Sequence, residues 1–171
     1  SPATFHAIVE NKTIRTSDLS KMNDSMELAW GIDMALDEII NQKKIIGDDL
    51  ASILEDKLEY VNNNARLLIS CFSLDGDILS QWRSYADDAT GFAVGFDLPT
   101  FSTFLENLGK IIYKEVDQRH ELRDRIINGG SLYRQCPNDN KGKMSLRIAM
   151  QLFTAACYMK NPAFSEEREV R

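Results

Sequence analysis

The apolar positions in the first third of the chain recur every three or four residues. The longest such stretch is Ser25–Lys43, and a second, Asp49–Val61, follows a break at Gly47. This spacing places the apolar side chains on one face of a helix, so we predict two amphipathic helices that pack on a sheet. A helix from Ser1 to about Glu10 is predicted to precede them, because serine followed by proline is typical of a helix start.

Shorter apolar runs in the rest of the chain predict strands. Ala65–Ser73 is rich in aliphatic residues and lies between turn-forming residues. In Gly91–Asp97 the apolar residues alternate, as they do on one face of a strand. The remaining predicted strands are the segments 13–17, 111–116 and 164–171.

Further helices are predicted at 79–86, 101–108, 117–127 and 144–160. The third of these is expected to end at Gly129-Gly130 and the last to stop before Pro162. Because strands and helices do not alternate regularly, we predict an α+β fold. It is expected to be a single domain over residues 1–171, with a mixed or antiparallel sheet of short strands and several packed helices. We expect flanking strand residues to be missing at one or both ends.

The composition narrows the classes of function. The chain has 171 residues, a net charge of −6 and a pI near 5.0, so broad nucleic-acid binding is not expected. No apolar run approaches the ~18 residues of a membrane span, and no signal-peptide pattern opens the chain. Cys71, Cys136 and Cys157 match neither a zinc site nor a disulfide framework. We therefore expect a cytoplasmic domain with no membrane partner and no metal.

One stretch of the chain is rich in basic residues, although acidic residues interrupt it. We interpret this stretch as the solvated face of a helix, with a phosphate-binding site as the alternative. Its cations are Lys110, Lys114, Arg119, Arg123, Arg125 and Arg134.

Two polar clusters in the first half of the chain are candidates for a functional cleft. Asn23 and Asp24 lie at the start of the long predicted helix, where capping of the backbone amides is the alternative role. Trp82 and Tyr85 are three residues apart on one helical face. That spacing suits either core packing or stacking on a flat ring.

A third polar cluster lies on the closing strand. With a period of two, Glu167, Glu169 and Arg171 share one face, so two carboxylates and a guanidinium line one surface. A solvated edge strand protected by charges has the same pattern. A shift of one residue would reverse the face, so which glutamate points inward stays open.

Five motifs occur together in an order that identifies a family resemblance. They are Met22-Asn23-Asp24 with Glu27, Cys71-Phe72-Ser73, Leu79–Asp87, Gly91–Asp97, and Lys160 with Phe164, Glu167, Glu169 and Arg171. Together they span most of the chain and resemble a bacterial family of unknown function, DUF2971. The chain departs from that family's pattern at Ser25, where proline is usual, and at Val170, where an aromatic residue is common. The family usually begins with a strand before the segment that starts here at Ser1.

The layout of an early strand, a middle Ser/Tyr region and a late Glu strand is similar to ADP-ribosyltransferase-like domains. That similarity implies that NAD binds in a cleft as substrate and that Glu167 or Glu169 is the catalytic glutamate. Tyr85 or Trp82 would stack on the nicotinamide, and Ser73 would support the ribose. The other candidate cofactor-binding residues are Asn23, Asp24 and Arg171.

Three hypotheses for the function follow. The first is an NAD-using ADP-ribosyltransferase-like enzyme or NAD glycohydrolase that acts in bacterial phage defence, as a toxin or in a stress response. The alternative is a non-catalytic sensor domain that recognises a nucleotide or a partner peptide. The third is a metal-dependent nuclease, which the acidic charge disfavours. Its metal ligands would come from Asp24, Asp75, Asp97 or Glu167.

Overall fold

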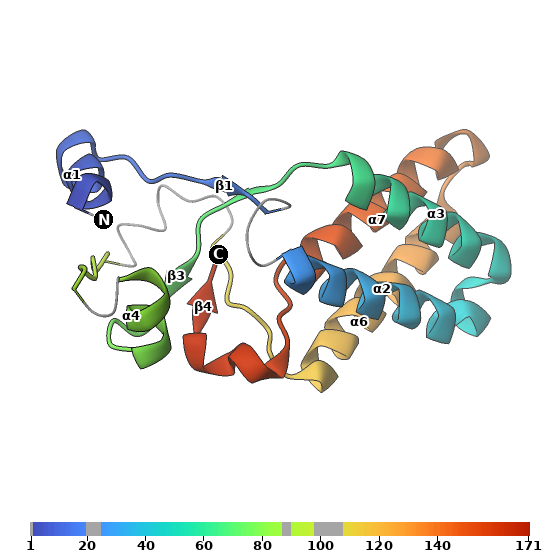
Figure 1. Ribbon diagram of the computed structural model, residues 1–171. Coiled ribbons are helices and arrows are strands. Elements are labelled where there is room, and N and C mark those ends of the chain that lie inside the picture. The colour runs from blue at the N-terminus through green and yellow to red at the C-terminus, as the bar shows by residue number, and fades with distance from the viewer. Residues whose placement is uncertain (1, 20–24, 87–89, 98–107) are drawn as a thin grey trace.

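The computed structural model describes residues 2–19, 25–86, 90–97 and 108–171. Its larger part is a bundle of four long helices, which lies beside a smaller part built from short strands and short helices (Figure 1). The bundle helices are α2 (Ser25–Ile46), α3 (Asp48–Asn64), α6 (Glu115–Gln135) and α7 (Lys141–Ala156). The smaller part contains α1 (Pro2–Asn11) and α4 (Leu79–Tyr85).

The core of the bundle is formed by the apolar stripes of its helices. Leu54, Leu58, Leu122, Ile126 and Leu152 are completely buried in one hydrophobic cluster. Each such side chain contributes about 1.5–3 kcal/mol by leaving water. The helices predicted at 25–43 and 49–61 are therefore confirmed, and they pack on other helices and not on a sheet.

Helix α6 continues through the glycine pair at which it was predicted to end. A Cβ atom on Gly129 would lie 2.9 Å from Cγ1 of Ile148, and one on Gly130 would lie 2.8 Å from Cγ2 of Ile46. The two glycines therefore allow α6 to approach α7 and α2 closely. The prediction was wrong because these glycines serve helix packing and not a helix end.

The described strands are short and form two antiparallel pairs. Strand β1 (Ser17–Asp18) pairs with β2 (Leu68–Ile69), with Ser17 opposite Ile69. Strand β3 (Phe72–Ser73) pairs with β4 (Glu169–Val170), with Phe72 opposite Val170. These pairs confirm the predicted α+β fold with short strands, and they bring the middle of the sequence to the closing segment.

Several predicted elements differ from the structure. Segment 91–97 forms no strand, and Phe92 instead stacks on Phe5 with ring centroids 5.1 Å apart. Segment 111–116 contributes a single bridge, between Ile112 and Met159, before α6 begins. The strand predicted at 65–73 is divided into β2 and β3. The helix predicted at 101–108 lies outside the described residues.

The closing segment is a strand only at its end. Pro162 begins the 3-10 helix η3 (Pro162–Glu167), and β4 follows only after Arg168. Arg168 has a left-handed backbone conformation, with φ of 46°. The predicted strand over 164–171 was therefore wrong for most of its length.

No helix in the described part of the chain combines the length and the apolar character that crossing a membrane requires.

Candidate functional site

Five charged side chains meet where the helix bundle adjoins strand β4. We call Glu27, Lys160, Glu167, Glu169 and Arg171 the charge cluster. Lys160 lies at its centre, with Nζ 2.7 Å from Oε1 of Glu27 and 2.9 Å from Oε2 of Glu169. The same ammonium group also donates to Oε2 of Glu167. One lysine therefore links all three carboxylates of the charge cluster.

Arg171 is the second cation of the charge cluster. Its Nε donates to Oε1 of Glu169 at 2.6 Å, and its Nη2 donates to Oε2 of Glu27 at 2.8 Å. Its Nη1 donates to the backbone oxygen of Cys157 at 2.8 Å. This planar group thus fixes the closing segment to α2 and to the end of α7 at the same time.

The helix bundle sets the position of Glu27 and Lys160. Glu27 lies in the first turn of α2, where the positive end of the helix dipole favours a carboxylate. Lys160 follows α7, and its backbone oxygen accepts a hydrogen bond from Nε2 of the completely buried Gln118 at 2.8 Å. Oε1 of Gln118 in turn accepts from Nε1 of Trp30 at 3.3 Å. This polar contact between α2 and α6 therefore fixes the backbone at Lys160.

The backbone on either side of Arg168 is held by side chains from other segments. The hydroxyl of Ser73 donates to the backbone oxygen of Glu167 at 2.8 Å. The backbone N–H of Glu169 donates to the hydroxyl of Tyr113 at 2.9 Å. Together with the left-handed Arg168, these bonds turn both Glu167 and Glu169 toward Lys160.

The charge cluster contains three carboxylates and two cations, so its side chains carry a formal charge of −1. The side chains of Glu169 and Glu27 are 7% and 8% exposed, whereas that of Glu167 is 18% exposed. Buried ions are stable only when partners replace the lost water. Glu167 is therefore the carboxylate of the charge cluster that a ligand reaches most easily.

The surroundings shift the pKa values of several groups in and beside the charge cluster. Burial alone lowers the pKa of Lys160, but its bonds to Glu167, Glu27 and Glu169 outweigh this and raise it. Cys71 is exposed as a residue, but desolvation of its thiol and a hydrogen bond to Glu169 raise the pKa of this thiol to about 12. This thiol stays protonated at neutral pH, so it donates to the carboxylate and is not a nucleophile.

The stability that Glu169 contributes is expected to fall in acid. Burial by itself raises the pKa of Glu169, but Arg171, Cys71 and Lys160 outweigh burial and hold this pKa below its ordinary value of 4.5. Such a carboxyl stabilises the fold above its unfolded-state pKa and loses that contribution as the pH falls through its folded-state pKa. Glu169→Gln should therefore destabilise the protein less at pH ~3 than at pH ~7. The difference in the loss of unfolding free energy should be about 1 kcal/mol or more.

Denaturant titrations of the wild type and of Glu169→Gln at the two pH values measure this change. Glu166→Gln is the matched control, because Glu166 is exposed and lies outside the charge cluster. A loss for Glu169→Gln that is equal at both pH values would contradict the expected protonation.

The structure brings some of the predicted site residues together and separates others. Glu167, Glu169 and Arg171 converge as predicted, although Glu167 lies on η3 and not on a shared strand face. Ser73 contacts the backbone of Glu167, so its hydroxyl proton is already engaged there. The predicted residues Asn23 and Asp24 lie outside the described residues. The catalytic and cofactor-binding roles of all these residues stay predictions.

The two aromatic candidates lie on the short helix α4, beside β3 (Figure 1). Nε1 of Trp82 donates to Oδ1 of Asp77 at 2.9 Å, and the side chain is partly buried. Tyr85 is 71% exposed. Trp82 is therefore fixed by the turn before α4, while the ring of Tyr85 is accessible to a ligand.

The sequence reasoning missed three residues that support the charge cluster. Gln118 and Tyr113 carried no signal, because isolated polar residues in a basic stretch look solvated. Cys71 belongs to one of the family motifs, but its contact with Glu169 was not predicted, and it lies between β2 and β3. Glu27 and Lys160 did have a signal, since both belong to the motifs that carried the family resemblance.

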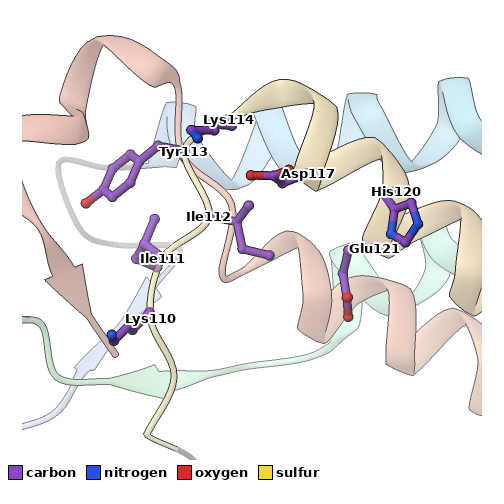
Figure 2. Close-up of a pocket in the computed structure, with 8 residues that line it drawn as sticks. All are labelled: Lys110, Ile111, Ile112, Tyr113, Lys114, Asp117, His120 and Glu121. Atoms are coloured by element: carbon purple, nitrogen blue, oxygen red, sulfur yellow. The ribbon is translucent and has the colours of Figure 1, made fainter.

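A shallow depression of about 550 Å³ lies beside the charge cluster and does not include it. Figure 2 shows its lining, which comes from the segment before α6 and from the first turns of α6. The lining residues are Lys110, Ile111, Ile112, Tyr113, Lys114, Asp117, His120 and Glu121. Tyr113 lines the depression and also contacts the charge cluster, because its hydroxyl accepts a hydrogen bond from the backbone N–H of Glu169.

The proposed metal ligands of a nuclease do not form a metal site in the described part of the chain, where no group of three or more His, Cys, Asp and Glu could hold a metal ion. Asp75 forms an ion pair with Arg168 at 3.3 Å, and Glu167 is bound by Lys160. Asp97 lies in the irregular segment, and Asp24 lies outside the described residues. No observation thus favours the nuclease hypothesis.

Comparison with known proteins gives one match. A family model described as a protein of unknown function, DUF2971, matches residues 81–171, which is more than half of the chain. The matched region contains Lys160, Glu167, Glu169 and Arg171, whereas Glu27 and Ser73 precede it. No curated protein and no solved structure matches the chain.

Proposed function

The chain belongs to the DUF2971 family, whose function is unknown, and we propose that it is an NAD-using enzyme of the ADP-ribosyltransferase type. The observation that carries this proposal is the charge cluster, in which three carboxylates face two cations and Glu167 is the most exposed carboxylate. A surplus of negative charge beside an accessible carboxylate stabilises positive charge on a bound ligand.

NAD brings positive charge to such a site in two ways. Its nicotinamide ring is cationic, and loosening of the bond between nicotinamide and ribose moves positive charge onto the ribose as an oxocarbenium ion. Glu167 would stabilise that ion or orient the acceptor. Lys160 would hold Glu167 in position from the protein side.

The proposed reaction is balanced without a further reactant. Nicotinamide leaves with the electron pair of the broken bond, and an oxygen or nitrogen of the acceptor forms the new bond to ribose. The acceptor releases one proton. When water is the acceptor, the products are ADP-ribose, nicotinamide and a proton.

Other predicted residues take supporting roles in this proposal. The exposed ring of Tyr85, or that of Trp82, would stack on the nicotinamide. Ser73 would act through the backbone of Glu167, to which its hydroxyl donates. Glu169 is bound by both cations of the charge cluster, so we assign the reacting role to Glu167 and a positioning role to Glu169.

Nicotinamide release from NAD tests the proposal. We expect the full chain to release nicotinamide and Glu167→Gln to release it at least about 100-fold more slowly, since stabilisation of the developing charge is lost. Glu166→Gln is the matched control, because the neighbouring Glu166 is exposed, and it should release nicotinamide at the wild-type rate. Wild-type release by Glu167→Gln, or no release by the full chain, would defeat the proposal.

One observation favours a second function, a non-catalytic nucleotide-recognition domain. Lys160 binds every carboxylate of the charge cluster, which leaves each glutamate less free to act on a substrate. In that case calorimetry would detect binding of NAD or ADP-ribose while nicotinamide release stayed at the background rate. The charge cluster would then hold the binding surface in shape.

A further inference from the structure

The basic stretch before and along α6 contains two kinds of cation. Its arginines are engaged with neighbouring groups, whereas Lys110 and Lys114 form no ion pair within the described part of the chain. Arg119 binds Glu115 at 3.0 Å, Arg123 binds Glu38 at 3.1 Å, Arg125 binds Glu121 at 2.6 Å, and Arg134 donates to the backbone oxygen of Ile45 at 3.1 Å. The interpretation as a solvated helix face therefore suits the arginines and leaves the lysines unexplained.

Both lysines line the depression beside the charge cluster (Figure 2). Two acidic residues, Asp117 and Glu121, also line it, but the carboxylate of Glu121 is already bound by Arg125. Within the described residues, Asp117 is thus the one lining carboxylate that forms no ion pair, against two lysines. The lining side chains sum to a formal charge of zero, and Arg125, which binds Glu121 from outside the lining, brings the local balance to one positive charge in a protein whose net charge is −6.

The depression and the charge cluster lie along the same piece of backbone. The N–H of Ile111 donates to the backbone oxygen of Glu169 at 3.0 Å, and the hydroxyl of Tyr113 accepts from the N–H of Glu169 at 2.9 Å. Lys110 forms a bridge with Val170. A ligand in the depression would consequently lie beside β4 and Glu169 of the charge cluster.

We propose that this depression is a binding site for the phosphate groups of a nucleotide, held by Lys110 and Lys114. Ammonium groups on flexible stems bind phosphate oxygens as point charges, and they do not require one fixed geometry. The choice of a dinucleotide rests on the proposed function, in which the diphosphate of NAD or ADP-ribose would lie here while the nicotinamide ribose reaches Glu167. Binding of phosphate by the lysines does not depend on catalysis.

The arrangement explains how a negative site and a negative substrate are compatible. The charge cluster carries a net negative charge, so by itself it would repel the diphosphate of NAD. The lysines offer the diphosphate a separate place of opposite charge. Each end of the dinucleotide thereby meets its electrostatic complement.

Calorimetry with ADP-ribose and with inorganic pyrophosphate tests the proposal. We expect Lys110→Gln and Lys114→Gln each to weaken binding of both probes by about five- to tenfold, and added salt to weaken wild-type binding. Lys44→Gln is the matched control, because Lys44 is exposed on α2, outside the depression, and forms no ion pair within the described residues. It should bind both probes as the wild type does. All three positions are exposed, so denaturant titration should give unchanged stability.

The outcomes separate this inference from the proposed function. Lysine-dependent binding of ADP-ribose without nicotinamide release would support the inference and defeat only the proposed catalysis. Nicotinamide release with an unchanged KM for NAD in both lysine variants would defeat the inference and leave the catalysis standing. The inference would also be overturned if neither ADP-ribose nor pyrophosphate bound, or if a single-stranded oligonucleotide bound and these two probes did not.

Discussion

Replacement of Lys160 by methionine is expected to lower the free energy of unfolding by about 3–5 kcal/mol. Methionine keeps an unbranched apolar stem but removes the ammonium group that binds Glu27, Glu167 and Glu169. Glu27 and Glu169 would then share Arg171, and Glu167 would lose the cation that binds it, in a place where Lys160 itself is only 2% exposed. An uncompensated buried charge is more costly than the absence of the whole ion pair.

Denaturant titration at two pH values measures this effect and identifies its cause. Lys160 helps to hold down the pKa of Glu169, so Glu169 should take up a proton more readily in the variant, and the loss of stability should be smaller at pH ~4 than at pH ~7. Lys44→Met is the matched control, because Lys44 is exposed and should change stability by less than about 0.5 kcal/mol. A loss below about 1 kcal/mol for Lys160→Met would show that water already solvates the charge cluster.

Substitution of Gly31 by alanine is expected to destabilise the protein by about 1–3 kcal/mol. A Cβ atom at this position in α2 would lie 2.5 Å from the backbone oxygen of Ala156 and 2.9 Å from its Cα atom. These are backbone atoms, which cannot rotate away as the end of a flexible side chain can. The end of α7 must shift, and with it Cys157, whose backbone oxygen accepts from Arg171.

Gly142→Ala is the control for this substitution, because Gly142 lies in α7 with open space around it. Alanine there should stabilise the helix by up to about 1 kcal/mol, since it is a better helix former than glycine. Urea titration of the two variants should therefore give changes of opposite sign. Equal stability of the two would mean that α2 and α7 separate at little cost.

The long helices were predictable because their signal is local and repeated. Over Ser25–Ile46 the apolar residues keep one face for several turns, and the core of the bundle covers that face. The sequence did not reveal what covers each face, so a sheet was expected where helices α6 and α7 lie. The glycines of α6 were misread for the same reason, since their function depends on Ile148 and Ile46 in other helices.

The strands were less predictable because short apolar runs have several structural uses. The aromatic residues of segment 91–97 suggested a pleated strand, yet Phe92 stacks on Phe5 and Phe96 contacts Phe72 edge to face. Ring contacts hold these residues without a ladder of backbone hydrogen bonds, and Phe92 and Phe96 stay 63% and 37% exposed. Arg168 gave no warning either, since a left-handed conformation is uncommon for residues other than glycine.

The candidate site was predicted in part, but the structure gives a different physical reason why its side chains meet. A period of two placed Glu167, Glu169 and Arg171 on one face, and these side chains do meet. They meet because of the turn at Arg168 and the central Lys160, which that periodicity does not describe. Gln118 and Tyr113 could not be found, because their role appears only when segments distant in sequence come together.

The ion pair between Glu27 and Arg171 joins residues that are 144 positions apart. Closing so long a loop has an entropic cost that nearby contacts must offset first, so the charge cluster should be among the last parts to assemble during folding. A chain released before Lys160 would contain α2, α3, α6 and α7 and yet lack both cations of the charge cluster. A measurement of helix content alone would therefore not show that folding is complete. Formation of the ion pair between Glu27 and Arg171 would show it.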